Sequence, residues 1–360
     1  MCLADYVLLL INPGSTSTKV ALYLGTKCFR MQSIAHKAEE LAVYPGIIEQ
    51  CSFRLTTVEA FLGTALSALG GDRQIDAVAG MGGLLRPLPG GTYATSDALL
   101  QDLQSGVQGQ HASNLGGLLA HGIAQSLGVQ AYVVDPVSVD EFTDLARISG
   151  HPLIVRRSLS HALNIKAVAR RVCREMGLSF FNSRLVVAHL GGGISVAPLQ
   201  NGRIMDVNNA NEMGPFSPER TGSLPAGELA ALCFSGRYSA QEIKKQIAGQ
   251  GGMVAYLGTN DAREAYQRAG RGDVQAQLIM RAMAYQIAKE IGAMSTVLHG
   301  KVDAIILTGG LANSDSLVRD ISQYVEFIAP VKVWPGEDEM LALAEGVCRV
   351  LAGEEQAKQY

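Results

Sequence analysis

The stretch VLLLINPGSTSTKVALYL, residues 7–24, indicates how this chain folds. The apolar run at residues 7–11 has the length of a short buried strand, and residues 19–24 have the composition of a second strand. A polar turn with Gly14 near its centre lies between them, and Gly25 begins a tight turn toward a third strand. The stretch therefore predicts three consecutive strands, the first two joined by a turn of the size that holds a phosphate group.

The same pattern returns in the second half of the chain. Residues 185–189 and 194–198 are apolar, and three glycines separate them. Asn201-Gly202 is a hairpin signal that leads to a third strand at residues 204–207. Each triplet of strands is followed by alternating helical and strand patterns. The repeat predicts an α/β fold of two duplicated domains, each a mixed sheet flanked by helices, with a ligand cleft between them.

Hydrophobic spacing predicts the remaining elements. Apolar residues recur at helical intervals in five segments: 56–69, 113–127, 161–176, 274–299 and 340–352. Short apolar runs predict further strands at residues 75–79, 131–134 and 304–307.

Composition restricts the class of protein. With 48% hydrophobic and 18% charged residues among 360, the chain has the material for sizeable cores. A net charge of −3 without a basic block argues against a nucleic-acid partner. The apolar run near the start is too short for a signal peptide or a membrane span. The six cysteines are widely spaced, which argues against a CxxC metal or redox site and favours reduced, buried thiols in the cytoplasm.

The first polar turn has the residues of a phosphate-binding loop. No GxxxxGK[ST], GxGxxG or GxSxG motif occurs, which argues against a Walker ATPase, a dinucleotide-binding domain and an α/β-hydrolase. A glycine allows an anion to approach the backbone, and hydroxyl, amide and ammonium groups can donate to its oxygens. The candidate phosphate ligands are Asn12, Gly14, Ser15, Thr16, Ser17 and Lys19. A polar hairpin without a ligand is the alternative.

Two glycine turns in the second half suit a nucleotide. The turn after His189 has Gly191, Gly192 and Gly193, which remove every Cβ from the path of a triphosphate, although a β-bulge would also explain them. His189 could be a ligand or a core histidine. Gly309 and Gly310 follow an apolar strand, where ligands of open α/β sheets bind, and they leave room for an adenosine. Close packing of a helix on the strand is the alternative there.

Asp135 lies at the carboxyl end of a predicted strand, directly before Pro136. A carboxylate that faces bound phosphate would be repelled unless a cation joins the two, so Asp135 implies Mg²⁺. An ordinary Asp-Pro turn is the alternative.

Taken in order, five motifs resemble those of the acetate and butyrate kinase family, the acetokinases. They are residues 12–19, HLGGG at 189–193, Asn201-Gly-Arg203, GPFSPER at 214–220 and TGG at 308–310. The GPFSPER segment and the overall length are most similar to butyrate kinases. The resemblance implies the fold shared by acetokinases, sugar kinases, Hsp70-type ATPases and actin, in which two duplicated α/β domains surround an ATP cleft.

The resemblance also implies a division of the chain. An N-terminal domain at residues 1–155 would hold the acyl substrate and the first phosphate loop, and a C-terminal helix at residues 340–360 would join it. Residues 156–339 would form the nucleotide-binding domain. Homodimers or higher homo-oligomers are implied as well.

Roles for single residues follow from the matching motifs. The first phosphate loop corresponds to Asn12, Ser15, Ser17 and Lys19, the second to His189 and Gly191–Gly193, and the adenosine loop to Gly309 and Gly310. Asp135 matches the catalytic aspartate associated with the metal, and Glu339 or Asp338 matches a second acidic position near Mg²⁺. His161 matches the second histidine of the FHGTSH segment of acetate kinases, and Arg157 stands where the first would be.

One segment departs from the family pattern. Acetate kinases have an arginine in a GHR segment for the substrate carboxylate, whereas GMGGLLRP at residues 80–87 has Met81 at the expected basic position. Arg86 or Arg220 could supply the charge. Met81, Leu84 and Leu85 are candidates for the wall of the acyl pocket, with core packing as the alternative.

The implied reaction is butanoate + ATP = butanoyl phosphate + ADP, a reversible in-line phosphoryl transfer with ATP and Mg²⁺ as cofactors. A carboxylate is already ionised at pH 7, so it needs no general base. We therefore expect Asp135 to act through Mg²⁺ or its water, and Arg157 and Arg220 to neutralise charge. The alternatives are a kinase for acetate, propanoate or branched short-chain acids, and a regulatory ATP-binding protein of the same fold.

Overall fold

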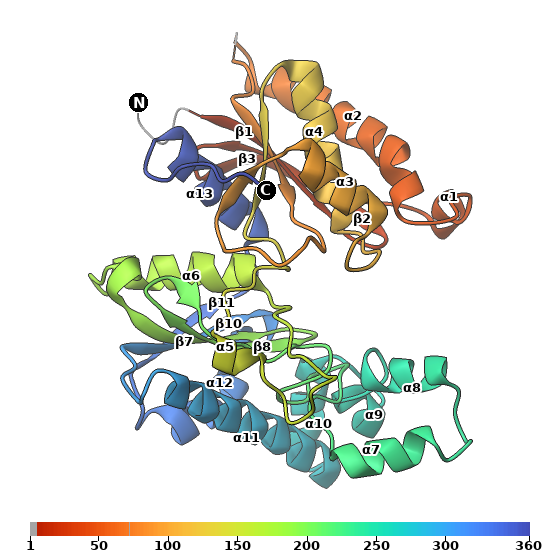
Figure 1. Cartoon of the computed structure of the whole chain (residues 1–360), viewed down its shortest axis with the longest axis vertical. Coiled ribbons are helices and arrows are strands. Elements are labelled where there is room, and N and C mark those ends of the chain that lie inside the picture. Colours follow the sequence, from red (N-terminus) through yellow and green to blue (C-terminus); the bar gives the residue numbers. More distant parts are fainter. Residues whose placement is uncertain (1–5, 72) are drawn as a thin grey trace. The chain divides into compact units, whose positions relative to one another are not determined.

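The computed structural model describes residues 6–71 and 73–360, which form two compact units (Figure 1). One unit contains the chain up to Val139 together with Asp338–Tyr360, and the other contains Asp140–Glu337. The sequence break at Gly150 had suggested a join between residues 155 and 156. Cys2 lies outside the described residues.

The sheet of the first unit has the strand order β3-β2-β1-β4-β6-β5. The first three strands are antiparallel neighbours, whereas β4 and β6 run parallel to β1, and β5 lies antiparallel at the edge. Their bounds are β1 Val7–Pro13, β2 Ser17–Leu24, β3 Lys27–Ala35, β4 Ala77–Met81, β5 Thr92–Ala94 and β6 Gln130–Val134.

The sheet of the second unit has the order β11-β10-β7-β8-β9. Its strands are β7 Arg184–Leu190, β8 Ile194–Gln200, β9 Arg203–Ile204, β10 Ala304–Gly309 and β11 Val331–Pro335. Again three antiparallel strands come first. The later strand β10 then pairs in parallel with β7, and β11 pairs in parallel with β10. The predicted duplication is therefore confirmed, because both sheets follow the same path.

Helices cover both faces of the first sheet (Figure 1). Alternate residues of β1 explain this: Leu9 and Ile11 join a core with α2 and α4, while Leu8 and Leu10 are buried on the opposite side. The helix α13, which is Glu339–Leu351, packs on β1, β4 and β6. The other helices of this unit are α1 Ala38–Ala42, α2 Cys51–Leu69, α3 Asp97–Ser105 and α4 Asn114–Leu127.

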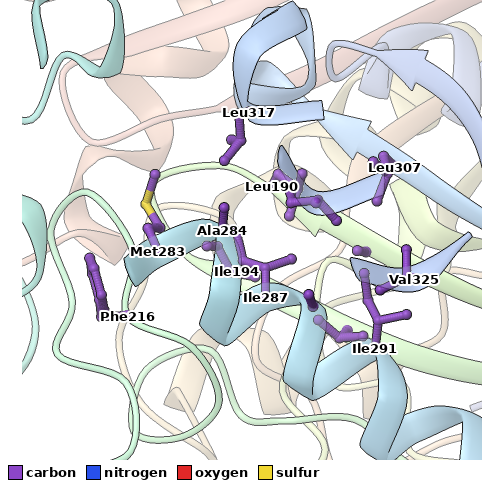
Figure 2. Close-up of a cluster of buried hydrophobic side chains, with 14 of the residues drawn as sticks. Leu190, Ile194, Phe216, Met283, Ala284, Ile287, Ile291, Leu307, Leu317 and Val325 are labelled. Atoms are coloured by element: carbon purple, nitrogen blue, oxygen red, sulfur yellow. The ribbon is translucent and has the colours of Figure 1, made fainter. Parts of the chain in front are cut away.

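In the second unit, α6 (Ala162–Glu175) covers one face of the sheet and α11 (Val274–Val297) the other (Figure 1). Figure 2 shows Met283, Ile287 and Ile291 of α11 against Leu190 and neighbouring strand residues in a continuous apolar core. The remaining helices are α5 Asp144–Arg147, α7 Ala226–Cys233, α8 Ala240–Ile247, α9 Met253–Leu257, α10 Ala262–Gly270 and α12 Asp315–Val325.

Two differences from the expected elements have physical causes. Helix α2 begins at Cys51 rather than at residue 56, because buried Arg54 replaces an apolar residue in the inward stripe of its first turns. Strand β9 is only Arg203–Ile204 instead of residues 204–207, because side-chain bonds of Asp206 and Asn208 replace the strand ladder. The expected elements also lack helices α1, α3, α5, α7 to α10 and α12 and strands β5 and β11.

Cysteine burial differs from the expectation as well. Cys173 and Cys348 are buried and Cys51 is half-buried, but Cys28 and Cys233 are exposed. The prediction of six buried thiols is thus wrong for these two. Burial raises the pKa of the Cys348 thiol to about 11. Within the described residues, no helix is both long and apolar enough to cross a membrane.

Candidate functional site

In the first unit, three parallel strands bring candidate residues to one edge of the sheet. Ile11 pairs with Gly80, and Met81 pairs with Val134. Asn12, Met81 and Asp135 therefore lie at the carboxyl ends of β1, β4 and β6, where open α/β sheets bind ligands.

The turn between β1 and β2 places its polar groups outward. Asn12 pairs with Lys19, and the amide of Gly14 donates to the carbonyl of Ser17 at 2.8 Å, which closes the turn. Ser15 and Thr16 at its tip are exposed. The turn therefore offers hydroxyl and amide donors to solvent, as a phosphate loop requires.

Side chains alternate between the two faces of β2, so that one face is partly exposed and the other is buried. Ser17 and Lys19 are half-buried and lie on one face, whereas Thr18 between them is completely buried. The Thr18 hydroxyl lies 2.8 Å from Nε2 of His36. Thr18 is therefore part of the scaffold, while its neighbours can reach a ligand.

Asp135 is held in an uncommon conformation. Its φ is 37°, in the left-handed region that few non-glycine residues adopt, although aspartate does so more readily than most. Its side chain is buried and accepts a hydrogen bond from the amide of Gly91 at 2.7 Å, and its own amide donates to the Gly91 carbonyl at 2.9 Å. Such an over-determined geometry is typical of functional sites.

The structure distinguishes the two acidic candidates at the start of α13. Asp338 caps the helix, because its Oδ1 accepts the amide of Leu341 at 3.1 Å. Glu339 instead accepts a hydrogen bond from the side-chain amide of Asn12. Glu339 is therefore the acidic residue in contact with the first turn.

The donor set of this edge suits a hard cation such as Mg²⁺, with the oxygens of Asp135 and Glu339 as candidate ligands. In residues 6–71 and 73–360, no three histidine, cysteine or acidic side chains gather as a metal centre. Mg²⁺ in nucleotide enzymes characteristically uses one or two carboxylates and completes its shell with water and substrate phosphates. Two oxygen donors therefore fit that mode better than a dedicated protein cage.

In the second unit, two histidine rings stack beside the glycine turn. The rings of His161 and His189 lie 3.9 Å apart at an interplanar angle of 12°. Nδ1 of His161 lies 3.0 Å from the hydroxyl of Ser195, and Nδ1 of His189 lies 2.7 Å from the amide of Asn164. With Asn164 donating to Nδ1, the proton of a neutral His189 is on Nε2.

This Nε2 atom faces an acidic side chain. It is buried and forms no hydrogen bond within the described part of the chain, although Oε1 of Glu337 lies 3.2 Å away. Buried polar atoms without a hydrogen bond are rare, and each calls for an explanation such as strain, a catalytic role or a bound water or ion.

Burial lowers the pKa of His161 well below its usual range, and the neighbouring His189 and Arg220 lower it further. His161 is therefore neutral near pH 7. It can donate or accept one hydrogen bond at this site without adding charge.

The third glycine of the turn, Gly193, makes room for Arg220. A Cβ on Gly193 would lie 2.2 Å from Nη1 of Arg220, so any side chain there would displace the guanidinium. Nη1 donates to the carbonyl of Ala210 at 3.1 Å, and the hydroxyl of Ser217 donates to the carbonyl of Gly192 at 2.5 Å. The GPFSPER segment thus packs directly on the HLGGG turn and places a half-buried cation there.

The two glycines at the end of β10, Gly309 and Gly310, have different surroundings. Gly309 has a φ of 89°, and a Cβ would lie 2.4 Å from the carbonyl oxygen of Leu190, so this position requires glycine for packing. A Cβ on Gly310 would meet no atom within 4 Å. Gly310 therefore borders open space, as expected if an adenosine lies there.

Several predicted residues are placed elsewhere. Arg157 is exposed in a segment without regular structure. Arg86 is 67% exposed and forms an ion pair with Asp102 at 2.7 Å, so its charge is already engaged. Leu85 is completely buried in a core with Leu88 and others, so core packing, and not the acyl wall, is its role.

Sequence reasoning missed four residues of the site. Asn164, Ser195 and Ser217 orient the histidines and the glycine turn, and Arg54 lies behind the first turn. Each is a polar residue buried among apolar ones, and its partner lies far away in the sequence. In the sequence, only a polar residue within an apolar stretch could have indicated these four site residues.

Comparison with known proteins identifies the family. The profile of the acetokinase family matches residues 145–333. Butyrate kinase 2 of Clostridium acetobutylicum is 51% identical over 99% of both chains. The probable butyrate kinase 2 of Caldanaerobacter subterraneus subsp. tengcongensis is also 51% identical, with the same coverage. This chain belongs to the acetokinase family.

Solved structures agree with the fold. The acetate kinase of Porphyromonas gingivalis superposes with a TM-score of 0.77 over 95% of this chain and 99% of its own, at 19% identity. A propionate kinase from Francisella tularensis gives a TM-score of 0.73 at 18% identity, over 95% of this chain and 98% of its own. The predicted duplicated α/β fold is thereby confirmed.

Proposed function

We propose that this protein transfers the terminal phosphoryl group of ATP to the carboxylate of a short-chain acid, with butanoate as the preferred acceptor. The products are the acyl phosphate and ADP, and the reaction is reversible. The observation that supports this best is the cluster of Arg220 and two stacked histidines on the triglycine turn, which combines one cation with imidazole hydrogen-bond donors. The similarity to butyrate kinases over nearly the whole chain favours butanoate.

The cluster suits an acceptor that has no proton to lose. A carboxylate is ionised at pH 7, so the barrier is the approach of an anion to an anionic phosphoryl group. Arg220 can neutralise part of that charge, and fixed donors can stabilise the equatorial oxygens. The carboxylate oxygen forms the new bond to phosphorus as the bond to the ADP oxygen breaks, and the leaving electron pair stays on ADP.

We assign the binding roles by position. The turn residues Asn12, Gly14, Ser15, Thr16, Ser17 and Lys19 bind phosphate oxygens in the first unit. In the second unit, Nε2 of His189 and the backbone of Gly191, Gly192 and Gly193 bind phosphate, and Gly309 and Gly310 border the adenosine.

The reacting groups are assigned to His161, Arg220 and Asp135. Neutral His161 donates to an oxygen of the transferring group, and Arg220 balances its charge. Arg157 remains a predicted contact of the same group, and its exposure leaves it able to reach a ligand. Mg²⁺, when bound, would neutralise phosphate charge, and Asp135 and Glu339 would hold it through their carboxylate oxygens.

Acyl selectivity should be modest. Each buried methylene contributes about 0.8 kcal/mol, so neighbouring chain lengths should differ by at most about tenfold in kcat/KM. We place Met81 and half-buried Leu84 near the acyl chain, because they follow the carboxyl end of β4. A cytoplasmic location and a homo-oligomeric state are part of the same proposal.

Formation of acyl hydroxamate tests the proposal. The purified protein is assayed with Mg-ATP and acetate, propanoate, butanoate, isobutanoate or isovalerate. We expect product with several acids and the highest kcat/KM at four carbons. A maximum at a different acid would correct the acceptor, and ATP turnover without any hydroxamate would refute carboxylate phosphorylation.

A further inference from the structure

Arg54 has a position that no role above explains. It lies in α2 and is completely buried, at 0% exposure. Arginine is almost never fully buried unless other groups satisfy its donors. Its contacts therefore show what this buried charge does.

The guanidinium of Arg54 is aimed at the backbone of the first turn. Nη1 donates to the carbonyls of Gly14 at 2.8 Å and Ser17 at 2.9 Å, and Nη2 donates to the carbonyl of Ser15 at 3.0 Å. Nη1 also lies 3.2 Å from the hydroxyl of Thr18. One side chain thus binds three carbonyls of a single turn.

A second residue of the same segment holds the guanidinium in place. Oε1 of Gln50 accepts hydrogen bonds from Nε at 3.1 Å and from Nη2 at 2.8 Å. The one remaining carbonyl of residues 14–17, that of Thr16, accepts the amide of His36 at 2.9 Å. All four carbonyl oxygens of the turn therefore bond to the protein.

This arrangement determines where the amides point. In a planar trans peptide, the N–H of one residue points opposite to the carbonyl of the residue before it. Because the carbonyls of Gly14, Ser15 and Thr16 are bound on the protein side, the N–H groups of Ser15, Thr16 and Ser17 point away from it. Successive outward N–H groups form a concavity that binds anions.

The charge of Arg54 has no acidic counterpart among the described residues that contact it. Its partners are carbonyls, an amide and a hydroxyl, all of them neutral. Burial lowers the pKa of its guanidinium, but an arginine remains charged at pH 7. The field of this cation is therefore available to an anion on the outer side of the turn.

We propose that Arg54 is a positioning residue for the phosphate site of the first turn: it binds the turn carbonyls from behind and places a positive charge under the outward amides. The proposal rests on the proposed function, which makes the phosphate chain of ATP the ligand. Arg54 does not touch that ligand, because the turn backbone lies between them.

The test measures KM for Mg-ATP and kcat separately, together with calorimetric binding of Mg-ATP. For Arg54→Met we expect KM for ATP to rise by about thirtyfold or more, with a smaller loss in kcat. Arg54→Lys keeps the charge but loses the paired guanidinium donors, and it should raise KM for ATP by about tenfold. Gln50→Leu leaves Arg54 present but loosened, and should raise KM by a few fold.

Two controls separate positioning from loss of stability. Val58→Ala removes buried apolar volume one helical turn further along α2, and should lower Tm without changing KM for ATP. Millimolar guanidinium should partly restore the KM of Arg54→Ala and leave that of Val58→Ala unchanged. If Arg54→Met does not fold, Arg54→Lys and Gln50→Leu decide the question by the same readouts.

An unchanged KM and Mg-ATP affinity, within twofold, in the folded Arg54 variants would overturn the proposal. A wild-type protein that forms no acyl phosphate but binds Mg-ATP would refute the proposed function alone, and the binding data of the variants would still decide the role of Arg54. A wild-type protein that binds no Mg-ATP would overturn both.

Discussion

The turns after β1 and β7 occupy equivalent places in two duplicated sheets, yet their positive charges are arranged differently. Behind the first turn, Arg54 is completely buried and binds backbone carbonyls. At the second turn, Arg220 is half-buried and lies against Gly193, where a ligand can meet it. Under the proposed function, the same topology supports a turn shaped for binding and a turn equipped for reaction.

The glycines of the two turns also differ in the space that a side chain would find there. A Cβ on Gly14 would make only ordinary contacts, with Oγ of Ser17 at 3.4 Å as the nearest atom. A Cβ on Gly193 would collide with Arg220 at 2.2 Å. The first turn owes its shape to hydrogen bonds from behind, whereas the second depends on the absence of side chains in front.

The largest expected effect comes from removing Arg220, to which we assign the reactive charge. Arg220→Ala should lower kcat by about 10³-fold or more, since a single arginine that stabilises a transferring phosphoryl group contributes on that scale. Steady-state kinetics with Mg-ATP and butanoate measures it. A loss of less than tenfold in a folded variant would show that the second turn is not the reactive one.

Gly193→Ala should lower kcat by about 10²-fold, because its methyl group displaces the guanidinium of Arg220. Gly192→Ala is the comparison variant: its Cβ would lie 3.7 Å from Oε2 of Glu219, so it leaves Arg220 in place. Because Gly192 is assigned to phosphate binding, its methyl group should act on KM for ATP rather than on kcat. Gly14→Ala should leave Tm unchanged. Equal effects on kcat at positions 192 and 193 would remove the proposed difference between the two turns.

His161 should make stability depend on pH. Burial lowers its pKa in the folded state, so below about pH 6.5 the unfolded chain binds a proton that the folded chain does not. The free energy of unfolding should therefore fall as the pH drops from 7 to 5. His161→Asn should flatten this slope by at most about 1.4 kcal/mol per pH unit in urea titrations. Parallel curves for wild type and variant would contradict a neutral, buried His161.

The smallest effect is expected at Arg86. Its guanidinium is exposed and paired with Asp102, so Arg86→Gln should change KM for butanoate by less than twofold. A tenfold increase in that KM would assign the charge that binds the carboxylate to Arg86.

Local patterns predicted much of this molecule. Apolar runs and glycine turns identified the strands that both sheets share, because these signals lie within a few adjacent residues. The turn residues Asn12 to Lys19 and Gly191 to Gly193 also came from short motifs. Gly309 matched its motif, although packing against Leu190 is an additional reason for it.

Contacts between distant segments were not predictable. Arg54 reaches Gly14 across 40 positions of the sequence, and it precedes the helix expected at residues 56–69. Asn164 meets His189 in the same long-range way. Helices α7 to α10 bury few of their residues, but α12 was missed as well, although its buried residues Leu317, Ile321 and Val325 lie at helical spacing. Which acidic residue faces Asn12 depended on side-chain direction, and only the structure separates Glu339 from Asp338.

The most direct test of the central claim follows both products by ³¹P NMR. The protein is incubated with Mg-ATP and butanoate labelled with ¹⁸O in its carboxylate. The account predicts an acyl phosphate resonance that grows with that of ADP and shows the isotope shift of a bridging ¹⁸O, because the carboxylate oxygen attacks phosphorus. Release of ADP with inorganic phosphate alone, at a rate independent of butanoate, would contradict it.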